Sequence, residues 1–167
     1  MLSAKMIAYY IIGFGAFMLF FLLPIRKLEW LIPSIYWVNI ILLLSVEFVG
    51  VSKLGAQRWI EIPFINFTIQ PSEIMKPAFV LMLAYLIKKT PPDEEGYNLK
   101  QFLKLSMYIL LPFILILKEP DLGTALMLLI TGYGVLFIVG VNRKIWISIA
   151  LLIGISSPIL YENLHDY

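Results

Sequence analysis

A glutamate and a lysine stand three residues apart in the run Gln70-Pro71-Ser72-Glu73-Ile74-Met75-Lys76. Pro71 suits the first turn of a helix, because its missing N–H group costs nothing there. Side chains three positions apart share one face of a helix, so Glu73 and Lys76 can form an ion pair. Inside a membrane bundle such a pair is a candidate functional site. At the bundle surface Glu73 would be a first-turn acid and Lys76 would reach the lipid headgroups, and the residues alone leave both interpretations open.

A second group of polar residues lies in the run 118–125, which reads K-E-P-D-L-G-T-A. Asp121 is a good N-cap for a helix that begins directly after it, and this role needs no further function. The density of polar side chains in so short a turn also raises an alternative. Lys118, Glu119 and Thr124 would then gather with Asp121 at the mouth of a helix bundle.

The third stretch, residues 55–60, reads G-A-Q-R-W-I. The guanidinium of Arg58 is suited to a phosphate group, and Trp59 is suited to lie against a sugar ring or a lipid chain. Polar and apolar residues alternate from Ile60 to Phe67, which predicts a short hairpin or a segment in the membrane interface. These features favour an anionic, lipid-linked substrate. The candidate substrate-binding residues are Arg58, Trp59, Gln70 and Thr124.

Long apolar segments must position these residues. Of the 167 residues, 60% are hydrophobic and 14% are charged, and the mean hydropathy is +0.88. A soluble domain would be about a quarter charged. A spanning helix needs about 20 residues, and the apolar segments lack the alternation of a β-barrel strand. We therefore expect an all-α, polytopic transmembrane bundle in one domain, with six spans at about residues 6–25, 31–49, 71–87, 103–118, 122–141 and 145–161.

Residue counts exclude several kinds of site. The chain has no cysteine and one histidine, His165 near its end. Cys-based metal sites and nucleophiles are excluded, as is a Ser-His-Asp triad in the middle of the chain. The net charge of +2 is too small to indicate a nucleic-acid partner. No phosphate-binding loop or dinucleotide fingerprint is present.

The connectors between the apolar segments divide into two groups by charge. Basic residues mark the cytoplasmic side of a membrane protein. The more basic group should face the cytoplasm, which leaves residues 50–70 and 118–121 outside. This order also places the N-terminus outside, so we expect an earlier helix and an internal fragment of a larger membrane protein. The more basic group comprises Arg26, Lys27, Lys88, Lys89, Lys100, Lys104, Arg143 and Lys144.

The three runs G-A-Q-R-W-I, Q-P-S-E-I-M-K and E-P-D-L-G-T-A, in this order, resemble the SEDS family of cell-wall polymerases. The resemblance extends over essentially the whole chain and leans toward the members that act in cell elongation. It implies a protein of about ten transmembrane helices, by family analogy. It also implies polymerisation of lipid II at the outer face of the bacterial cytoplasmic membrane, with a class B penicillin-binding protein as partner.

Carried over by position, the resemblance places Arg58 and Trp59 in the first outer loop, near the substrate entrance. It places Glu73 and Lys76 as a polar pair in the central cavity, and Asp121 as the acid that faces the same cavity. These three ionisable residues would support catalysis.

The resemblance places the main base beyond Tyr167, so the 167-residue chain alone is expected to be inactive. Glu119 departs from the family pattern, which usually has glutamine there. The extra acid would repel a pyrophosphate or face water.

Three functions follow from these observations. The first is a peptidoglycan glycosyltransferase, in which a base deprotonates a sugar 4-hydroxyl that attacks C1 and releases undecaprenyl pyrophosphate. The second is a flippase for lipid-linked precursors, although no inverted repeat is visible. The third is a scaffold that only recruits the penicillin-binding protein. The sequence identifies no cofactor and no set of metal ligands, and a divalent cation bound with the pyrophosphate stays possible.

Overall fold

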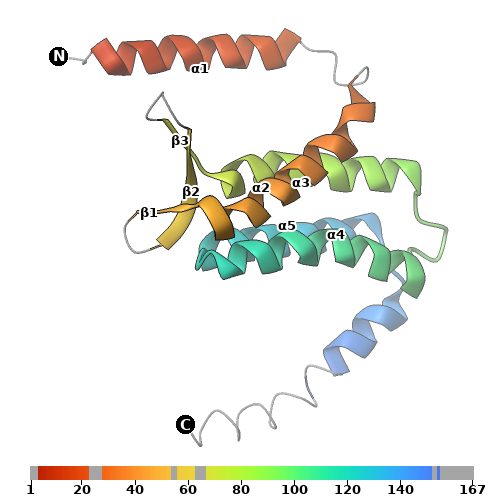
Figure 1. Ribbon diagram of the computed structural model, residues 1–167. Coiled ribbons are helices and arrows are strands. Elements are labelled where there is room, and N and C mark those ends of the chain that lie inside the picture. Colours follow the sequence, from red (N-terminus) through yellow and green to blue (C-terminus); the bar gives the residue numbers. More distant parts are fainter. Residues whose placement is uncertain (1–3, 23–27, 54–55, 63–66, 152–153, 155–167) are drawn as a thin grey trace, which may run out of the picture. The chain divides into compact units, whose positions relative to one another are not determined.

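Helices form most of the computed structural model, which describes residues 4–22, 28–53, 56–62, 67–151 and 154 (Figure 1). The chain divides into two compact units, Met1–Leu31 and Ile32–Tyr167, and each is described by itself. The first unit contains α1 (Ala4–Leu22) and the short 3-10 helix η2 (Glu29–Leu31). The second unit contains α2 (Ile32–Val49), β1 (Val51–Lys53), β2 (Ala56–Ile62), β3 (Phe67–Ile69), α3 (Pro71–Lys89), α4 (Leu99–Lys118), α5 (Leu122–Val139) and a last helix over residues 143–151.

Each of the six predicted apolar segments contains a helix, so the all-α prediction is confirmed. The helices α2, α3 and α5 begin within one residue of their predicted starts. The predicted ends at residues 25 and 161, and the basic residues Arg26 and Lys27, lie outside the described residues.

The start of α4 was predicted four residues too late. Asn98 caps the helix by accepting a hydrogen bond from the backbone N–H of Gln101 at 3.0 Å, and the Gln101 side chain accepts one from the Asn98 backbone N–H at 3.0 Å. This reciprocal capping box satisfies two N–H groups that the first turn leaves without partners. Hydropathy missed the turn because Lys100, Gln101 and Lys104 are polar.

Three helical segments of the described chain are long and apolar enough to cross a membrane: Glu29–Val49, Leu99–Lys118 and Leu122–Val139. The helix α3 is 19 residues long but does not meet this measure, because it carries charged residues at both ends. Glu73 and Lys76 lie near its start, and Lys88 and Lys89 close it. Such a helix has an apolar middle with ionisable ends.

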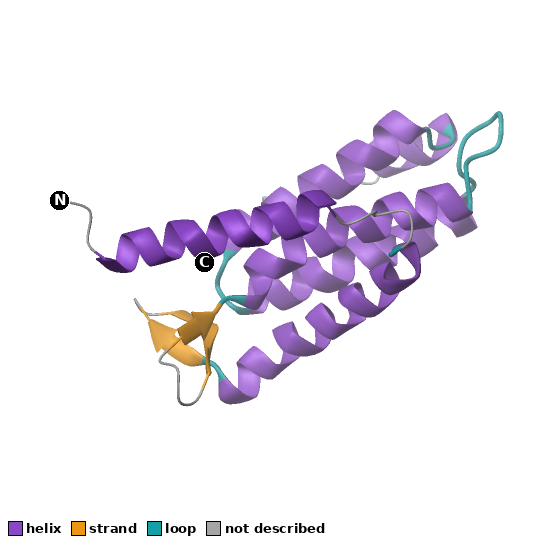
Figure 2. Cartoon of the chain, turned by 90° about the horizontal axis from the view of Figure 1, so that it is seen from above, coloured by secondary structure: helices purple, strands orange, loops and turns teal. Residues whose placement is uncertain are grey.

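The connector between α2 and α3 forms a three-stranded antiparallel sheet in the order β1-β2-β3. Ile60 pairs with Ile69 and Ile62 with Phe67, so the predicted hairpin is confirmed. Phe64 and Ile65, which were part of the predicted alternation, lie outside the described residues. Figure 2 shows the strands gathered at one end of the helices.

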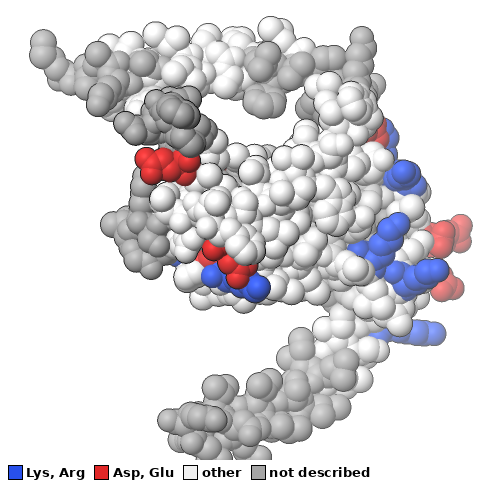
Figure 3. Space-filling model, viewed as in Figure 1, with Lys and Arg blue, Asp and Glu red and all other residues white. Residues whose placement is uncertain are grey.

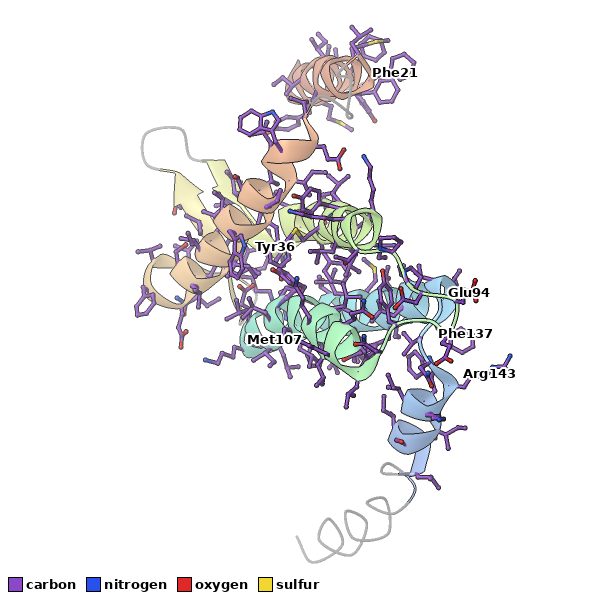
Figure 4. The ribbon with its side chains drawn as sticks, turned by 90° about the vertical axis from the view of Figure 1, so that its right-hand side faces the viewer. Phe21, Tyr36, Glu94, Met107, Phe137 and Arg143 are labelled. Atoms are coloured by element: carbon purple, nitrogen blue, oxygen red, sulfur yellow. The ribbon has the colours of Figure 1, made fainter. Side chains whose placement is uncertain are left out.

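The core lies where α2, α3, α4 and α5 meet. Tyr36 is fully buried, and its hydroxyl donates a hydrogen bond to the carbonyl of Tyr108 at 2.8 Å. Gly132 of α5 lies so close to α4 and α3 that a Cβ atom there would be 2.9 Å from Ile109 and from Phe79. Figure 4 shows Tyr36 among the helices, whereas Met107 of α4 is 71% exposed.

The other end of the helices is closed by the connector between α3 and α4. The Tyr97 backbone N–H donates to the Gly140 carbonyl at 3.1 Å, and the Asn142 N–H donates to the Tyr97 carbonyl at 3.1 Å. The buried Tyr97 hydroxyl also donates to the Thr90 carbonyl at 2.7 Å. The predicted basic connectors after α3 and α5 are therefore adjacent. Figure 3 shows charged side chains at both ends of the bundle and an uncharged belt between them.

Candidate functional site

Arg58 joins the sheet to the turn between α4 and α5. Its Nε donates a hydrogen bond to the Glu119 carbonyl at 3.0 Å, and a second guanidinium nitrogen donates to the Pro120 carbonyl. The strand that carries Arg58 is held in turn by Gln57, whose side-chain amide donates to the Val46 carbonyl of α2 at 2.9 Å. Two of the three sequence motifs, 61 residues apart, thus meet at the end of the bundle that carries the strands.

Asp121 completes this contact. Its carboxylate lies 3.8 Å from the Arg58 guanidinium, and its side chain is 12% exposed. The same carboxylate oxygen accepts a hydrogen bond from the Thr124 backbone N–H at 3.2 Å. The predicted N-cap role is confirmed, and Asp121 also balances the charge of Arg58. A guanidinium has five N–H donors, so Arg58 retains donors for a further anionic group.

Glu119 is buried beside this pair. The residue is 6% exposed, and neither carboxylate oxygen has a hydrogen-bond partner among the described residues. Burial, and to a lesser extent the nearby Asp121, raise the pKa of Glu119, whereas Arg58 lowers it. The net result is a pKa of about 7. The expectation that Glu119 faces water is therefore wrong. Sequence reasoning missed the burial, because it depends on a strand that comes 61 residues earlier.

Glu73 and Lys76 form the predicted ion pair in the first turns of α3. The Lys76 Nζ lies 2.7 Å from both carboxylate oxygens of Glu73. The Glu73 side chain is 54% exposed and the Lys76 side chain 29%, so the pair lies at the surface of the described bundle. The geometry confirms that Glu73 and Lys76 form an ion pair. That this ion pair lies in a substrate cavity stays a prediction.

The remaining candidates lie at the same end of the bundle. Trp59 follows Arg58 on β2, so its side chain points to the opposite face of the strand, and it pairs with Val51 of β1. Gln70 precedes α3 and donates from its side-chain amide to the Ser72 hydroxyl at 3.1 Å. The strand β3 ends directly before Gln70 and pairs with β2, so the sheet connects the Arg58 group to the Glu73–Lys76 pair.

The acidic residues do not form a metal site by themselves. Within the described ranges, no group of three His, Cys, Asp or Glu side chains is placed to hold a metal ion. The two carboxylates of the α4–α5 turn have an arginine beside them, which repels a cation. The arrangement is suited to an anion at Arg58.

The sequence matches known proteins over its whole length. The model of the cell cycle protein family of FtsW, RodA and SpoVE matches residues 1–167. The peptidoglycan glycosyltransferase MrdB of Helicobacter pylori is 52% identical over 166 residues, which are 99% of this chain and 44% of that protein. The MrdB of Escherichia coli is 35% identical over 148 residues, which are 87% of this chain and 38% of that protein. The chain thus spans less than half the length of these relatives.

Solved structures share the fold. A peptidoglycan synthase complex, solved in a study of how polymerization and crosslinking are coordinated, has a chain that superposes with a TM-score of 0.72 at 26% identity. The match covers 92% of this chain and 45% of that chain. The rod shape determining protein RodA of Thermus thermophilus superposes with a TM-score of 0.63 at 29% identity, over 82% of this chain and 45% of that chain.

Proposed function

Because the chain belongs to the cell cycle protein family of FtsW, RodA and SpoVE, we propose that it forms part of a peptidoglycan glycosyltransferase. The reaction is the polymerisation of lipid II into glycan strands during cell-wall elongation and the maintenance of cell shape. Relatives with 52% and 35% identity carry the name of this enzyme, so a flippase is not favoured.

The observation that carries the proposal is the contact between Arg58 and the α4–α5 turn. It places a cation beside the carboxylate of Asp121 at the end of the bundle that carries the strands. The start of α3 lies at the same end, because β3 pairs with β2 and leads into α3. A lipid-linked sugar diphosphate has an anionic group at the membrane surface and an apolar chain within the membrane. The polar end and the apolar belt of the bundle match these two parts (Figure 3).

Each residue has a role in the proposed reaction. The sugar 4-hydroxyl of one substrate attacks C1 of the other, the hydroxyl proton passes to a base, and the lipid diphosphate leaves with the electron pair. Arg58 donates hydrogen bonds to the diphosphate, and Trp59 packs against the sugar or lipid. Asp121, Glu73 and Lys76 orient the reacting groups and balance charge. The base is proposed to lie beyond Tyr167.

A divalent cation would enter with the diphosphate and neutralise part of its charge. The described carboxylates do not hold such an ion by themselves. Removal of free divalent ions with EDTA is therefore expected to weaken substrate binding, measured as a higher KM, without lowering the thermal stability of the protein.

The active end is proposed to face outward from the bacterial cytoplasmic membrane. The connectors at the opposite end carry Lys88, Lys89, Lys100, Lys104, Arg143 and Lys144, and basic residues favour the cytoplasmic side. A class B penicillin-binding protein, acting as the crosslinking partner, would receive the glycan strands on the outer side. The related synthase complex, which joins polymerization to crosslinking, supports this partnership.

The test is the conversion of labelled lipid II into glycan strands by the complete purified protein with its partner, whose transpeptidase is inhibited. Arg58→Lys retains the positive charge but loses the planar guanidinium, whose paired N–H groups can bind a phosphate through two hydrogen bonds. We therefore expect KM to rise about tenfold. The control is Glu61→Gln, an exposed acid on the same strand. Transport of lipid II across vesicles without any polymer would overturn the proposal.

A further inference from the structure

Glu119 is the one polar side chain at the proposed site that is buried with both oxygens unpartnered among the described residues. It follows the last residue of α4, where the helix dipole disfavours a negative charge. A buried carboxylate without hydrogen bonds is costly unless it holds a proton or has a cation beside it. The charge of the candidate site therefore depends on whether Glu119 is protonated.

Two nearby charged groups shift the pKa of Glu119. They are Arg58 and Asp121, which form the ion pair proposed to receive the anionic group of the substrate. Arg58 is bound to the backbone carbonyl of Glu119 itself, at 3.0 Å, and Asp121 is two residues away. Burial and Asp121 raise the pKa of Glu119, Arg58 lowers it, and the net result is a pKa of about 7. At the end of the bundle that carries the strands, the charged residues on the surrounding elements are Glu47 on α2, Lys53 on β1, Arg58 and Glu61 on β2, Glu73 and Lys76 on α3, Lys118 on α4 and Asp121 before α5.

We propose that Glu119 is a positioning residue that controls, by holding or releasing one proton, how well Arg58 receives the anionic group of the substrate. This inference rests on the proposed function, since the anionic group is the diphosphate of a lipid-linked sugar. Glu119 does not touch the substrate, because both of its oxygens are buried. It acts through Arg58.

The net charge of the α4–α5 turn depends on whether Glu119 is protonated. With Glu119 protonated, Arg58 and Asp121 cancel, and the free donors of Arg58 can bind an anion. When Glu119 releases its proton to solvent, the group of three carries a net negative charge. The second carboxylate then competes with the substrate for Arg58 and repels the diphosphate. Binding of the anionic substrate should therefore weaken as pH rises through neutrality.

The protonation of Glu119 can be measured without any substrate. Infrared difference spectra of the complete protein between pH 5.5 and 8.5 should contain the signal of a protonated carboxyl group that titrates near neutral pH. The signal should be lost in Glu119→Gln and retained in Glu61→Gln, which removes an exposed acid of the same strand. An unchanged signal in Glu119→Gln would overturn the inference.

The effect on the substrate is measured by steady-state polymerisation of lipid II over the same pH range. We expect KM to rise roughly threefold to tenfold between pH 6.5 and 8.5 in the wild type and in Glu61→Gln, from the added charge. The KM of Glu119→Gln should not change over this pH range, and kcat should be the same in the wild type and both variants. Parallel KM profiles in all three would overturn the inference. If no protein makes polymer, the proposed function fails, and the infrared signal still decides the protonation of Glu119.

Discussion

Arg58 holds a backbone turn as well as a carboxylate. Two of its N–H groups bind the carbonyls of Glu119 and Pro120, and the guanidinium lies 3.8 Å from Asp121. Carbonyls at the end of a helix lack partners within that helix, and a guanidinium is suited to bind several of them. One cation therefore organises this end of the bundle, and we propose that the same cation also binds the substrate.

The buried acid makes stability depend on pH. Unfolded Glu119 loses its proton near pH 4.5, whereas in the folded protein it retains the proton to about pH 7. Between these values the folded state binds more protons, so stability falls as pH rises through this window. We expect Glu119→Gln to be more stable than the wild type at pH 7.5, by at most about 3 kcal/mol. The two should converge at pH 4.5, as measured by thermal unfolding of the detergent-purified protein, and a gap independent of pH would contradict this account.

The sequence was sufficient to predict the contacts of residues whose partners are close in the chain. The Glu73–Lys76 pair and the Asp121 cap depend on spacings of three residues, which a helix fixes. The contact of Arg58 with the α4–α5 turn and the burial of Glu119 depend on residues about 60 positions apart. Only the packed sheet brings them together, so no local pattern could predict them.

At the scale of the elements, capping and close packing decide where helices begin and how they meet. The helix α4 begins at Leu99 because Asn98 and Gln101 exchange hydrogen bonds, although the residues that follow are polar. Hydropathy finds the apolar middle of a helix and misses such ends. The same limit applies to α3, whose charged ends lower its mean hydropathy although it packs with α2, α4 and α5.

Removal of the α4 cap should destabilise the bundle. Asn98→Ala leaves the backbone N–H of Gln101 without its acceptor, and such a loss costs about 1 kcal/mol. Lys100→Ala, an exposed position in the same turn, should change stability by less than about 0.5 kcal/mol. Chemical denaturation of the two variants in detergent checks the difference, and equal stabilities would show that the cap contributes nothing.

Two glycines of α5 should respond differently to alanine. A Cβ atom at Gly132 would lie 2.9 Å from Ile109 and Phe79, so those side chains must shift, at a cost of roughly 1–3 kcal/mol. Gly134, which has no atom within 4 Å of that position, should tolerate alanine or gain about 0.5–1 kcal/mol in helix propensity. Thermal unfolding midpoints separate the two, and a neutral Gly132→Ala would argue against the close packing of α3, α4 and α5.

At the scale of the whole molecule, the two ends of the bundle of α2 to α5 differ in their charged residues, and the end opposite the strands is the more basic. The sheet and the α4–α5 turn occupy one end, and the connector held by Tyr97 occupies the other (Figures 2 and 3). Glu94 lies in the same connector as Tyr97, and Arg143 follows Asn142, which is hydrogen-bonded to Tyr97. Both residues are labelled in Figure 4. The sequence predicted this division from its basic residues, because helices of a bundle alternate in direction.

The orientation in the membrane can be tested with introduced cysteines, since the chain contains none of its own. Glu61→Cys, at the end with the strands, should react with an impermeant maleimide added to spheroplasts. Glu94→Cys, in the connector between α3 and α4, should react only after the membrane is permeabilised. Both positions are exposed in the bundle. The reverse pattern would place the candidate site in the cytoplasm and exclude polymerisation on the outer side.

We propose that the Arg58–Asp121 group and the Glu73–Lys76 pair belong to one substrate site. This is tested by kcat/KM for lipid II polymerisation by the wild type, Asp121→Asn, Lys76→Met and the double variant, each as the complete protein with its partner. We predict that each single change lowers kcat/KM on the order of a hundredfold. The double change should cost much less than the product of the two, because the residues act on the same bound substrate. Losses that multiply independently, or full activity in Lys76→Met, would contradict the claim.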